Sequence, residues 1–214
     1  MTDQLDLAAS SQLDAVDRSL TVSPSGEMVA ARLTLSEDFE TDAADLWNAV
    51  TTGERIARWF APVHGDLQVG GSYQVEGNAG GVIESCDPPH QYTATWVMGE
   101  GMSRITVTVT DLGPGRSRFT LAHSAEVEEA FWAMYGPGAV GVGWDLGVLG
   151  LMLHLTTGED RPVDEEAWTA TEPARRFITD SGRRWADAAV AAGGAPEAAR
   201  AAEQNTNAFY LGTA

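Results

Sequence analysis

The sequence contains no lysine, a single cysteine and few positive charges. Its 13 basic residues are all arginine, against 31 aspartate and glutamate residues, which gives a formal net charge of -18. A chain this acidic repels phosphate backbones and anionic lipid headgroups, so we expect no nucleic-acid binding and no attachment to an anionic membrane surface. The lone Cys86 excludes an internal disulfide framework and is typical of a reducing compartment, which predicts a cytoplasmic protein.

A membrane-spanning segment is also not expected. The longest apolar run, residues 138–155, contains Asp145 near its middle and His154 near its end. A carboxylate at the centre of a bilayer costs about 3 kcal/mol, so this run predicts a buried helix and no membrane insertion. The first eleven residues are polar and acidic, and they lack the basic and apolar regions of a signal peptide.

Sequence motifs for metal binding, nucleophilic catalysis and dinucleotide binding are missing. The four histidines and the cysteine form neither an HxxxH nor a CxxC pair, so we expect no metal and no cofactor. There is no GxSxG elbow around a nucleophilic serine. Gly141, Gly143 and Gly147 miss the GxGxxG spacing by one position and lie inside a predicted helix, which excludes that motif.

What the sequence does contain is the pattern of an α+β protein. Alternating residues predict strands, above all Ile105, Val107 and Val109 between threonines, and then Phe119, Leu121 and His123. The expected order is a strand over 28–35, helices over 43–50 and 54–60, a hairpin over 66–69 and 72–76, strands over 80–85, 92–96, 105–109 and 119–123, and a long helix over 138–155. A sheet of this length needs one face covered, and only the 138–155 helix is long and apolar enough to cover it.

Three regions are predicted along the chain: an N-terminal arm over 1–26, a core domain over 27–158 and a helical C-terminal extension over 159–214. The arm is read as flexible or as a short helix near 13–20. Within the extension, helices are expected over 171–192 and 196–208. An exposed stripe through Phe177, Ser181 and Trp185 would indicate a partner surface, whereas a buried stripe would make the extension structural. We expect the buried arrangement, against the main domain or a second subunit, and a homodimer is left open.

Several segments resemble the START-like superfamily, often called SRPBCC, and are most similar to its branch named after the activator of a heat-shock chaperone's ATPase. The resemblance spans about Val29 to Leu155. It rests on Asp45–Thr51, Glu54–Pro62, Gly70–Tyr73, Gly81–Glu84, Pro88-Pro89 and Tyr92–Trp96.

The resemblance implies a helix-grip fold, in which a curved antiparallel sheet wraps around a long C-terminal helix and leaves an internal ligand cavity. Members of the superfamily include lipid carriers, hormone receptors and aromatic cyclases. A shared fold does not carry function with it, so the branch name assigns none here.

Aromatic residues on the predicted cavity-lining elements indicate an apolar ligand. The predicted ligand-binding residues are Trp59, Phe60, Tyr73, Glu84, Trp96, Arg104, His123, Trp144, Val148 and Met152. Among them, His123 either orients the ligand or is a hydrogen-bonded structural histidine. Glu84 and Arg104 either meet a polar end of the ligand or pair at the surface.

Three functions remain open from sequence. The first is non-catalytic binding of a small hydrophobic molecule, such as a lipid or a polyketide-like aromatic compound. The second is a cyclase- or hydrolase-type enzyme in which His123, with Glu84 or Arg104, performs acid–base chemistry. The third is a co-chaperone or regulatory interaction protein that uses the acidic surface and the C-terminal helices.

Overall fold

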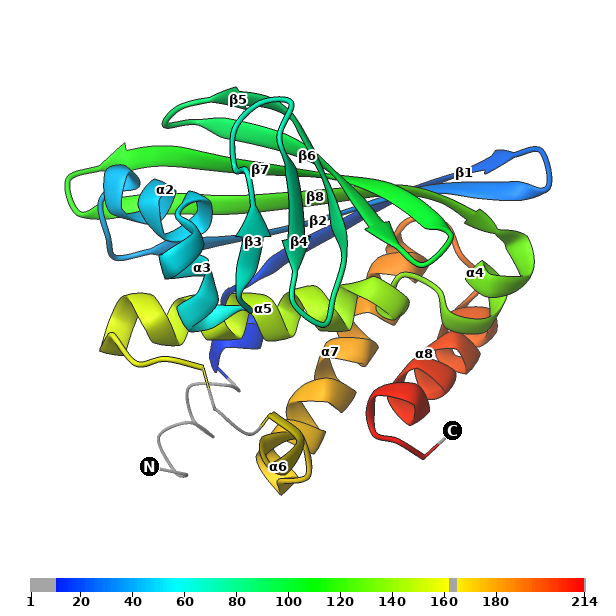
Figure 1. Ribbon diagram of the computed structural model, residues 1–214. Helices are drawn as coiled ribbons and strands as arrows, with labels where there is room; N and C mark the ends of the chain where they lie inside the picture. The colour runs from blue at the N-terminus through cyan, green and yellow to red at the C-terminus, as the bar shows by residue number, and fades with distance from the viewer. Residues whose placement is uncertain (1–10, 162–164, 214) are drawn as a thin grey trace. The chain divides into compact units, whose positions relative to one another are not determined.

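The chain folds into one sheet and a series of helices (Figure 1). The computed structural model describes residues 11–161 and 165–213. The strands are β1 (Asp17–Ser25), β2 (Met28–Phe39), β3 (Val63–Gly65), β4 (Ser72–Val75), β5 (Gly80–Asp87), β6 (Gln91–Met98), β7 (Gly101–Gly113) and β8 (Arg116–Glu128). The helices are α2 (Ala43–Thr51), α3 (Gly53–Trp59), α4 (Glu129–Tyr135), α5 (Gly138–Thr157), α6 (Glu165–Thr169), α7 (Glu172–Ala191) and α8 (Pro196–Tyr210).

The eight strands form a single sheet in the order β1-β2-β8-β7-β6-β5-β4-β3. Each neighbouring pair from β3 to β8 is antiparallel. Strands that are consecutive in the sequence are neighbours in the sheet, except that β2 lies beside β8 and not beside β3. An antiparallel sheet of this order with the long helix α5 after it confirms the predicted α+β, helix-grip class.

Residue alternation gives the sheet one apolar face. In the register, Ile105 on β7 faces Ala94 on β6 and His123 on β8, and Val107 faces Leu121. Directly paired residues point to the same side of a sheet, and these five are all buried. We call the side that carries them the inner face. The β-branched residues that dominate β7 suit a strand with one buried side.

By its internal contacts the chain divides into two compact units. The first, here called the helical unit, comprises residues 1–33, 126–149 and 162–214. The second, the sheet unit, comprises residues 34–125 and 150–161. Because β2, β8 and α5 each run through both units, the units are not successive stretches of sequence, unlike the predicted domain and extension.

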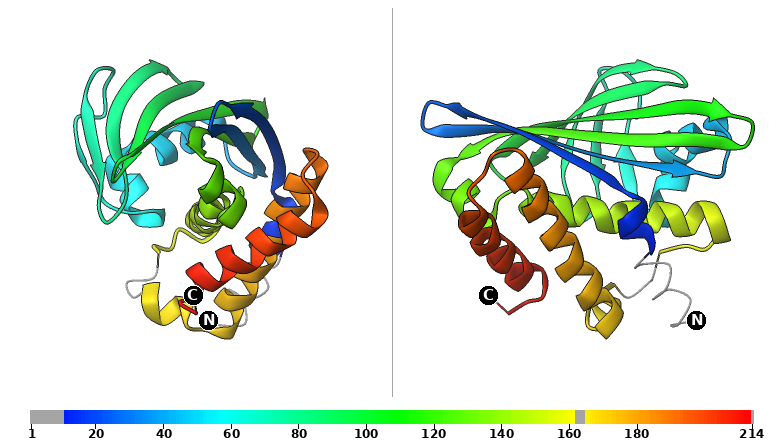
Figure 2. Two further views of the ribbon diagram at one scale, coloured as in Figure 1. Left: turned by 90° about the vertical axis from the view of Figure 1, so that its right-hand side faces the viewer. Right: turned by 180° about the vertical axis from the view of Figure 1, so that it is seen from behind.

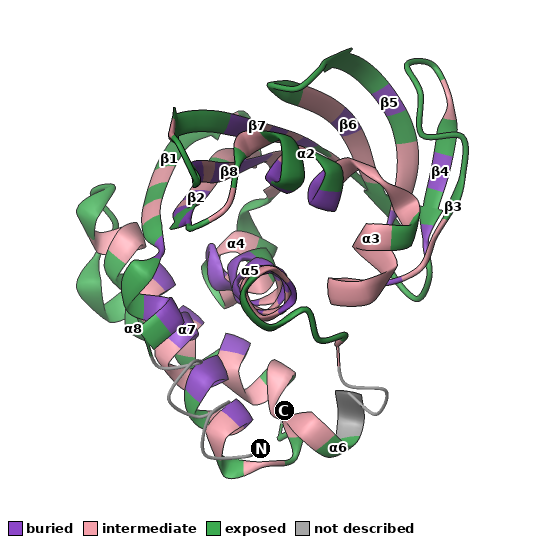
Figure 3. Cartoon of the chain, turned by 90° about the vertical axis from the view of Figure 1, so that its left-hand side faces the viewer, coloured by how far each residue is buried: buried purple, intermediate pink, exposed green. Residues whose placement is uncertain are grey.

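In the helical unit, α7 and α8 lie side by side (Figure 2). The chain reverses between them at Gly193, whose φ of 96° favours glycine. Phe177, Ser181 and Trp185 on α7 are at most 2% exposed, and Figure 3 shows buried positions along this helix. The stripe is therefore buried, as expected. It does not form a partner surface, and α7 has a structural role.

The predicted N-terminal arm is in part a strand. β1 forms a hairpin with β2 through a tight turn at Gly26, whose φ is 64°, and β1 also contacts α7. A boundary at residue 26 would cut this hairpin in two. No residue of β1 is fully buried, so this edge strand lacks the apolar alternation that would have predicted it.

Two further differences concern residues 66–69 and helix α5. The predicted strand over 66–69 is a loop, and Leu67 and Val69 are exposed; the short β3 pairs with β4 instead. Within the part of the chain that the structure describes, α5 alone is long and apolar enough to span a membrane. More than half of it, 56%, is buried, as in the core helix of a folded domain.

Candidate functional site

Four aromatic rings form a continuous series in the sheet unit. The ring centroids of Trp59 and Phe60 lie 5.5 Å apart, those of Phe60 and Trp96 lie 6.3 Å apart, and those of Trp96 and Tyr73 lie 6.5 Å apart. We call this series the aromatic cluster. Tyr73 is buried, whereas the other three are half-buried. Rings at these separations attract one another, and three of the four residues keep some accessible surface.

Helix α3 brings Trp59 and Phe60 to the cluster because it is fixed at two points. The indole N–H of Trp59 donates to the carbonyl of Ala49 on α2 at 3.0 Å. On the other side, α5 lies so close that a Cβ added at Gly150 would be 2.2 Å from the carbonyl oxygen of Trp59. Only glycine allows this approach. No residue of α3 is fully buried, although the helix carries Ile56 and Trp59.

The sheet supplies Tyr73 and Trp96. Tyr73 lies opposite Gly81 on β5, and its hydroxyl donates to the carbonyl of Thr95 at 2.6 Å. Burial raises the pKa of Tyr73 to about 12, so the phenol stays protonated and keeps this hydrogen bond at neutral pH. Trp96 lies opposite Ser103 on the inner face of β7.

A histidine–serine pair is the polar part of the same face. The Nε2 atom of His123 is 2.7 Å from the hydroxyl of Ser103, and that hydroxyl donates to the carbonyl of Trp96 at 2.9 Å. Because a serine hydroxyl has one proton, His123 must carry its proton on Nε2 and donate to Ser103. Burial lowers the pKa of His123 to about 4, so the imidazole is neutral at pH 7.

This arrangement does not activate Ser103. A general base would have to accept the hydroxyl proton, whereas His123 donates and the proton points to a backbone carbonyl. A pKa of about 4 also makes the imidazole a weak base at neutral pH. The pair can therefore orient a polar group of a ligand, but its geometry is not that of an acid–base couple.

Glu84 and Arg104 lie on the other side of the sheet. Glu84 follows the buried Ile83, and Arg104 precedes the buried Ile105, so alternation turns both side chains outward. Arg104 donates to both carboxylate oxygens of Glu84, at 2.7 Å for the Nη2 bond. These are exposed side chains. The surface pairing left open by the sequence is what the structure shows, and neither residue joins the aromatic cluster.

The three predicted residues on α5 belong to different units. Trp144 and Val148 lie in the helical unit and are 8% and 2% exposed. Met152 lies in the sheet unit and is half-buried. That the three line the same site as the aromatic cluster stays a prediction.

Sequence reasoning assigned no role to His154, which the structure connects to α3. Arg55 donates from Nε to His154 Nε2 at 2.9 Å, and from Nη1 to Asp45 Oδ1 at 2.9 Å and Asn48 Oδ1 at 3.0 Å. Burial, and then the charge of Arg55, lower the pKa of His154, so it accepts as a neutral imidazole. The link adds a second connection between the C-terminal end of α5 and α3.

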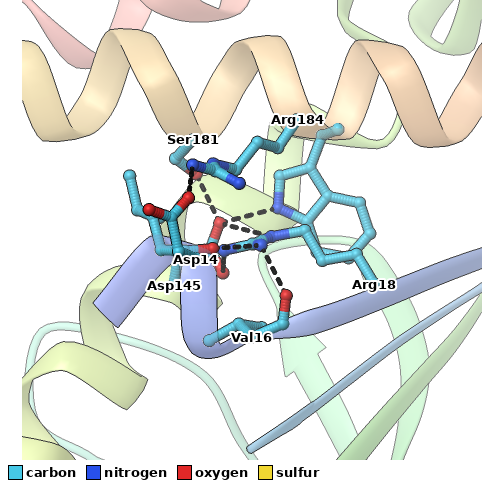
Figure 4. Close-up of polar contacts among 8 residues, drawn as sticks. Asp14, Val16, Arg18, Asp145, Ser181 and Arg184 are labelled. Carbon is cyan, nitrogen blue, oxygen red and sulfur yellow. Dashed lines mark hydrogen bonds and ion pairs between the residues drawn. The ribbon is translucent and has the colours of Figure 1, made fainter. Parts of the chain in front are cut away.

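The helical unit contains a buried ionic cluster around Asp145 (Figure 4). Arg18 on β1 donates to Oδ1 at 2.8 Å and to Oδ2 at 3.2 Å. Ser181 and Trp185 on α7 donate to Oδ2 at 2.5 and 3.0 Å. Asp145 is 0% exposed and the Arg18 side chain 6%. A carboxylate in the middle of a buried apolar helix needs a buried partner, but the sequence does not show which arginine supplies it.

Gly141 makes room for this cluster one turn before Asp145. A Cβ at Gly141 would lie 2.4 Å from the indole of Trp185, so the indole packs directly on the backbone of α5. The guanidinium of Arg18 lies 6.0 Å from the centre of the same indole. Gly141 thus admits a side chain of α7.

No group of three or more histidine, cysteine or carboxylate side chains that could hold a metal is found among the described residues. Carboxylates on the surface pair with arginine side chains and not with a metal ion; Asp38, for example, pairs with Arg118. The hydrogen bond from Arg118 lowers the pKa of Asp38.

The family of the chain follows from a match over residues 40–147, half of its length, to the model of activator of Hsp90 ATPase homolog 1-like proteins. The chain belongs to this family. The matched segment begins just before α2 and ends in α5, so it includes the aromatic cluster, His123 and Asp145. No curated protein matches the sequence.

The similarity of this chain to solved structures extends beyond residues 40–147. CalU16 from Micromonospora echinospora, solved in solution, is 27% identical with a TM-score of 0.68, over 83% of this chain and 97% of that one. The part of this chain that the CalU16 structure leaves uncovered is shorter than residues 1–26 and 159–214 together. Part of the N-terminal strand or helical extension is therefore common to both proteins.

Two more distant structures share the fold alone. EF2215 from Enterococcus faecalis, a conserved protein of unknown function, is 11% identical with a TM-score of 0.58, over 86% of this chain and 97% of that one. DynU16, from the dynemicin biosynthetic locus, is 19% identical with a TM-score of 0.52, over 62% of this chain and 50% of that one.

Proposed function

We propose that this protein binds a small hydrophobic molecule, a lipid or a polyketide-like aromatic compound, in the cytoplasm and without catalysing a reaction. The observation that carries the proposal is the aromatic cluster on the sheet unit, with His123 and Ser103 as the polar pair beside it. Tilted, mostly half-buried rings with one polar anchor suit an apolar ligand that has a single polar end.

The enzyme alternative is less well supported. It needs two or more ionisable groups that converge on the ligand. Glu84 and Arg104 are exposed and paired with each other, and the hydroxyl of Ser103 donates to the carbonyl of Trp96, so it does not donate to His123. The co-chaperone alternative loses only the α7 stripe, because Phe177, Ser181 and Trp185 are buried, whereas the acidic surface and α8 remain.

Native mass spectrometry of the freshly purified protein, followed by solvent extraction, tests the proposal. An apolar molecule bound at near-stoichiometric amount would support it and identify the ligand class. The affinity of that compound, or of an aromatic polyketide from a panel, should fall about tenfold on Trp96→Leu, because stacking is lost. Trp168→Leu is the matched control, since Trp168 lies outside the cluster on α6.

Two outcomes would overturn the proposal. One is a protein that carries nothing and gains no thermal stability from lipids or aromatic polyketides. The other is equal ligand affinity in the wild type and the Trp96→Leu variant.

A further inference from the structure

A second group of apolar and aromatic side chains lies in the helical unit, and three of its five members are exposed. On α4, Phe131 is 47% and Met134 is 49% exposed, and on α8 Phe209 is 62% exposed. The ring of Tyr135 joins them, 5.1 Å from Phe131 and 6.2 Å from Phe209, and Tyr210 follows at 5.5 Å from Phe209. We call these five residues the α4–α8 patch. Contiguous apolar surface of this kind marks an interaction site more often than scattered residues do.

The backbone beneath the patch is held in place. On α8, the side chains of Asn205 and Thr206 donate to the carbonyls of Met134 and Tyr135 at 2.9 and 2.8 Å. The hydroxyl of Tyr210 donates to the carbonyl of Ala139 at 3.0 Å. The two helices therefore present the patch as one preformed surface, which lowers the entropy cost of binding a partner.

Negative charge lies beside the patch at the start of α4. Residues 126–140 contain three glutamates and no arginine, whereas Glu203 on α8 pairs with Arg200 at 2.8 Å. Among the described residues Glu128 and Glu129 make no ion pair, and the N–H of Glu129 donates to the carbonyl of Glu27 in the β1–β2 turn. Carboxylates thus gather at the end of α4 that carries Phe131.

We propose that the α4–α8 patch is the docking surface for a cationic amphipathic helix of a partner protein. Aromatic side chains would cover the apolar side of that helix, and the glutamates would meet its arginines or lysines. A second copy of this chain fits less well, because it would bring the same carboxylates and a net charge of -18. The surface is independent of the proposed ligand site, since its residues belong to the helical unit.

Fluorescence anisotropy with a labelled Leu/Arg amphipathic peptide about five turns long tests the docking surface. A scrambled peptide of the same composition, which cannot form an amphipathic helix, is the peptide control. We expect the wild type to bind the amphipathic peptide about tenfold more tightly than the scrambled one. The double variant Phe131→Ser, Phe209→Ser should lose that difference.

The matched protein control is Met98→Ser with Met102→Ser, which removes equally exposed apolar side chains, 57% and 69%, from the sheet unit. It should bind the peptide as the wild type does, and circular dichroism should show that both double variants are folded. Glu128→Gln with Glu129→Gln should weaken binding about threefold and flatten its salt dependence.

Three results would overturn the proposal. The first is that the wild type binds neither peptide. The second is that binding is equal for the two peptides or unchanged in the Phe131, Phe209 variant, which would reveal general attraction to an acidic protein. The third is self-association in sedimentation velocity that the same variant abolishes, since a second copy would then occupy the patch.

Discussion

Asp145 shows how much one side chain contributes to the helical unit. It is a carboxylate on an otherwise apolar helix, and it has no exposed surface. Its partners come from β1 and from α7, which are distant from it in the sequence. A buried ion pair contributes little over an apolar replacement, but breaking it leaves a charge without a partner and is costly. The cluster therefore specifies which segments meet.

Asp145→Asn should lower the free energy of unfolding by about 3 kcal/mol, because Arg18 would keep its charge in a buried position. Chemical denaturation followed by circular dichroism measures the change. The control is Asp187→Asn, which breaks the exposed pair with Arg200 in the same unit and should cost less than about 1 kcal/mol. Equal losses in the two variants would contradict the assigned role.

His123 should make stability depend on pH. Its pKa falls to about 4 in the folded protein through burial, against about 6.5 when unfolded. Between these values the unfolded state binds the extra proton, so the folded state loses stability as pH falls from about 6.5 to about 4. From pH 7 to about pH 5 this loss should amount to about 2 kcal/mol.

The variant His123→Gln isolates this effect. Its stability should change less with pH than that of the wild type, so the difference between the two proteins should shrink on acidification. Denaturation curves across the pH range measure it, and His90→Gln, which removes an exposed imidazole, controls for the loss of any histidine. A constant difference between wild type and His123→Gln would show that His123 is not held neutral by burial.

At the scale of elements, periodicity predicted most of the fold. The strands around Ile105 and Leu121 and the helices α5, α7 and α8 lie where apolar spacing and glycine or proline breaks indicated. β1 was missed because an edge strand with polar, exposed residues has no apolar alternation. The loop at 66–69 was predicted as a strand from composition alone, which cannot tell whether a neighbouring strand is within reach.

The candidate site was predictable in part for the same reason. Alternation identified Trp96 and His123 as inward residues, and the resemblance to a known family indicated α3 as the carrier of Trp59. The sequence left Glu84 undecided, because only the burial of its neighbour Ile83 shows which face of β5 is the inner one. The Arg55–His154 link joins residues 99 positions apart, and no local pattern encodes such a contact.

Gly150 lies at the contact between α3 and α5, so a larger residue at this position should lower the stability of the protein. Gly150→Ala places a methyl group against a backbone carbonyl, which cannot rotate away, and should destabilise the protein by about 2 kcal/mol despite the better helix propensity of alanine. Gly143→Ala on the same helix meets only the hydroxyl of Tyr210, at 3.0 Å, and should be nearly neutral. Thermal denaturation compares the two, and a neutral Gly150→Ala would contradict the close approach.

The whole molecule carries far more negative than positive charge. Ion pairs such as Arg104 with Glu84 can neutralise only some of its carboxylates, because the chain has 13 arginines against 31 aspartates and glutamates. Self-repulsion among the remaining carboxylates opposes the compact state, and dissolved salt screens it.

Thermal stability should therefore rise by several degrees as sodium chloride increases from about 0.01 M to about 1 M, which is the range over which the screening length shortens to a few ångströms. Differential scanning calorimetry at neutral pH measures this. Sodium sulfate serves as a comparison, because it also strengthens apolar burial. A midpoint that falls with sodium chloride would mean that surface ion pairs outweigh the repulsion.

The discontinuous helical unit has a consequence for synthesis on the ribosome. Ser181 lies 36 residues after Asp145, and Trp185 lies 40 residues after it. When Asp145 leaves the exit tunnel, only Arg18 among its partners has emerged before it. The nascent α5 then has an apolar surface and an incompletely bonded carboxylate until α7 has also emerged. Translation rate or chaperone binding during this interval would thus influence the yield of folded protein.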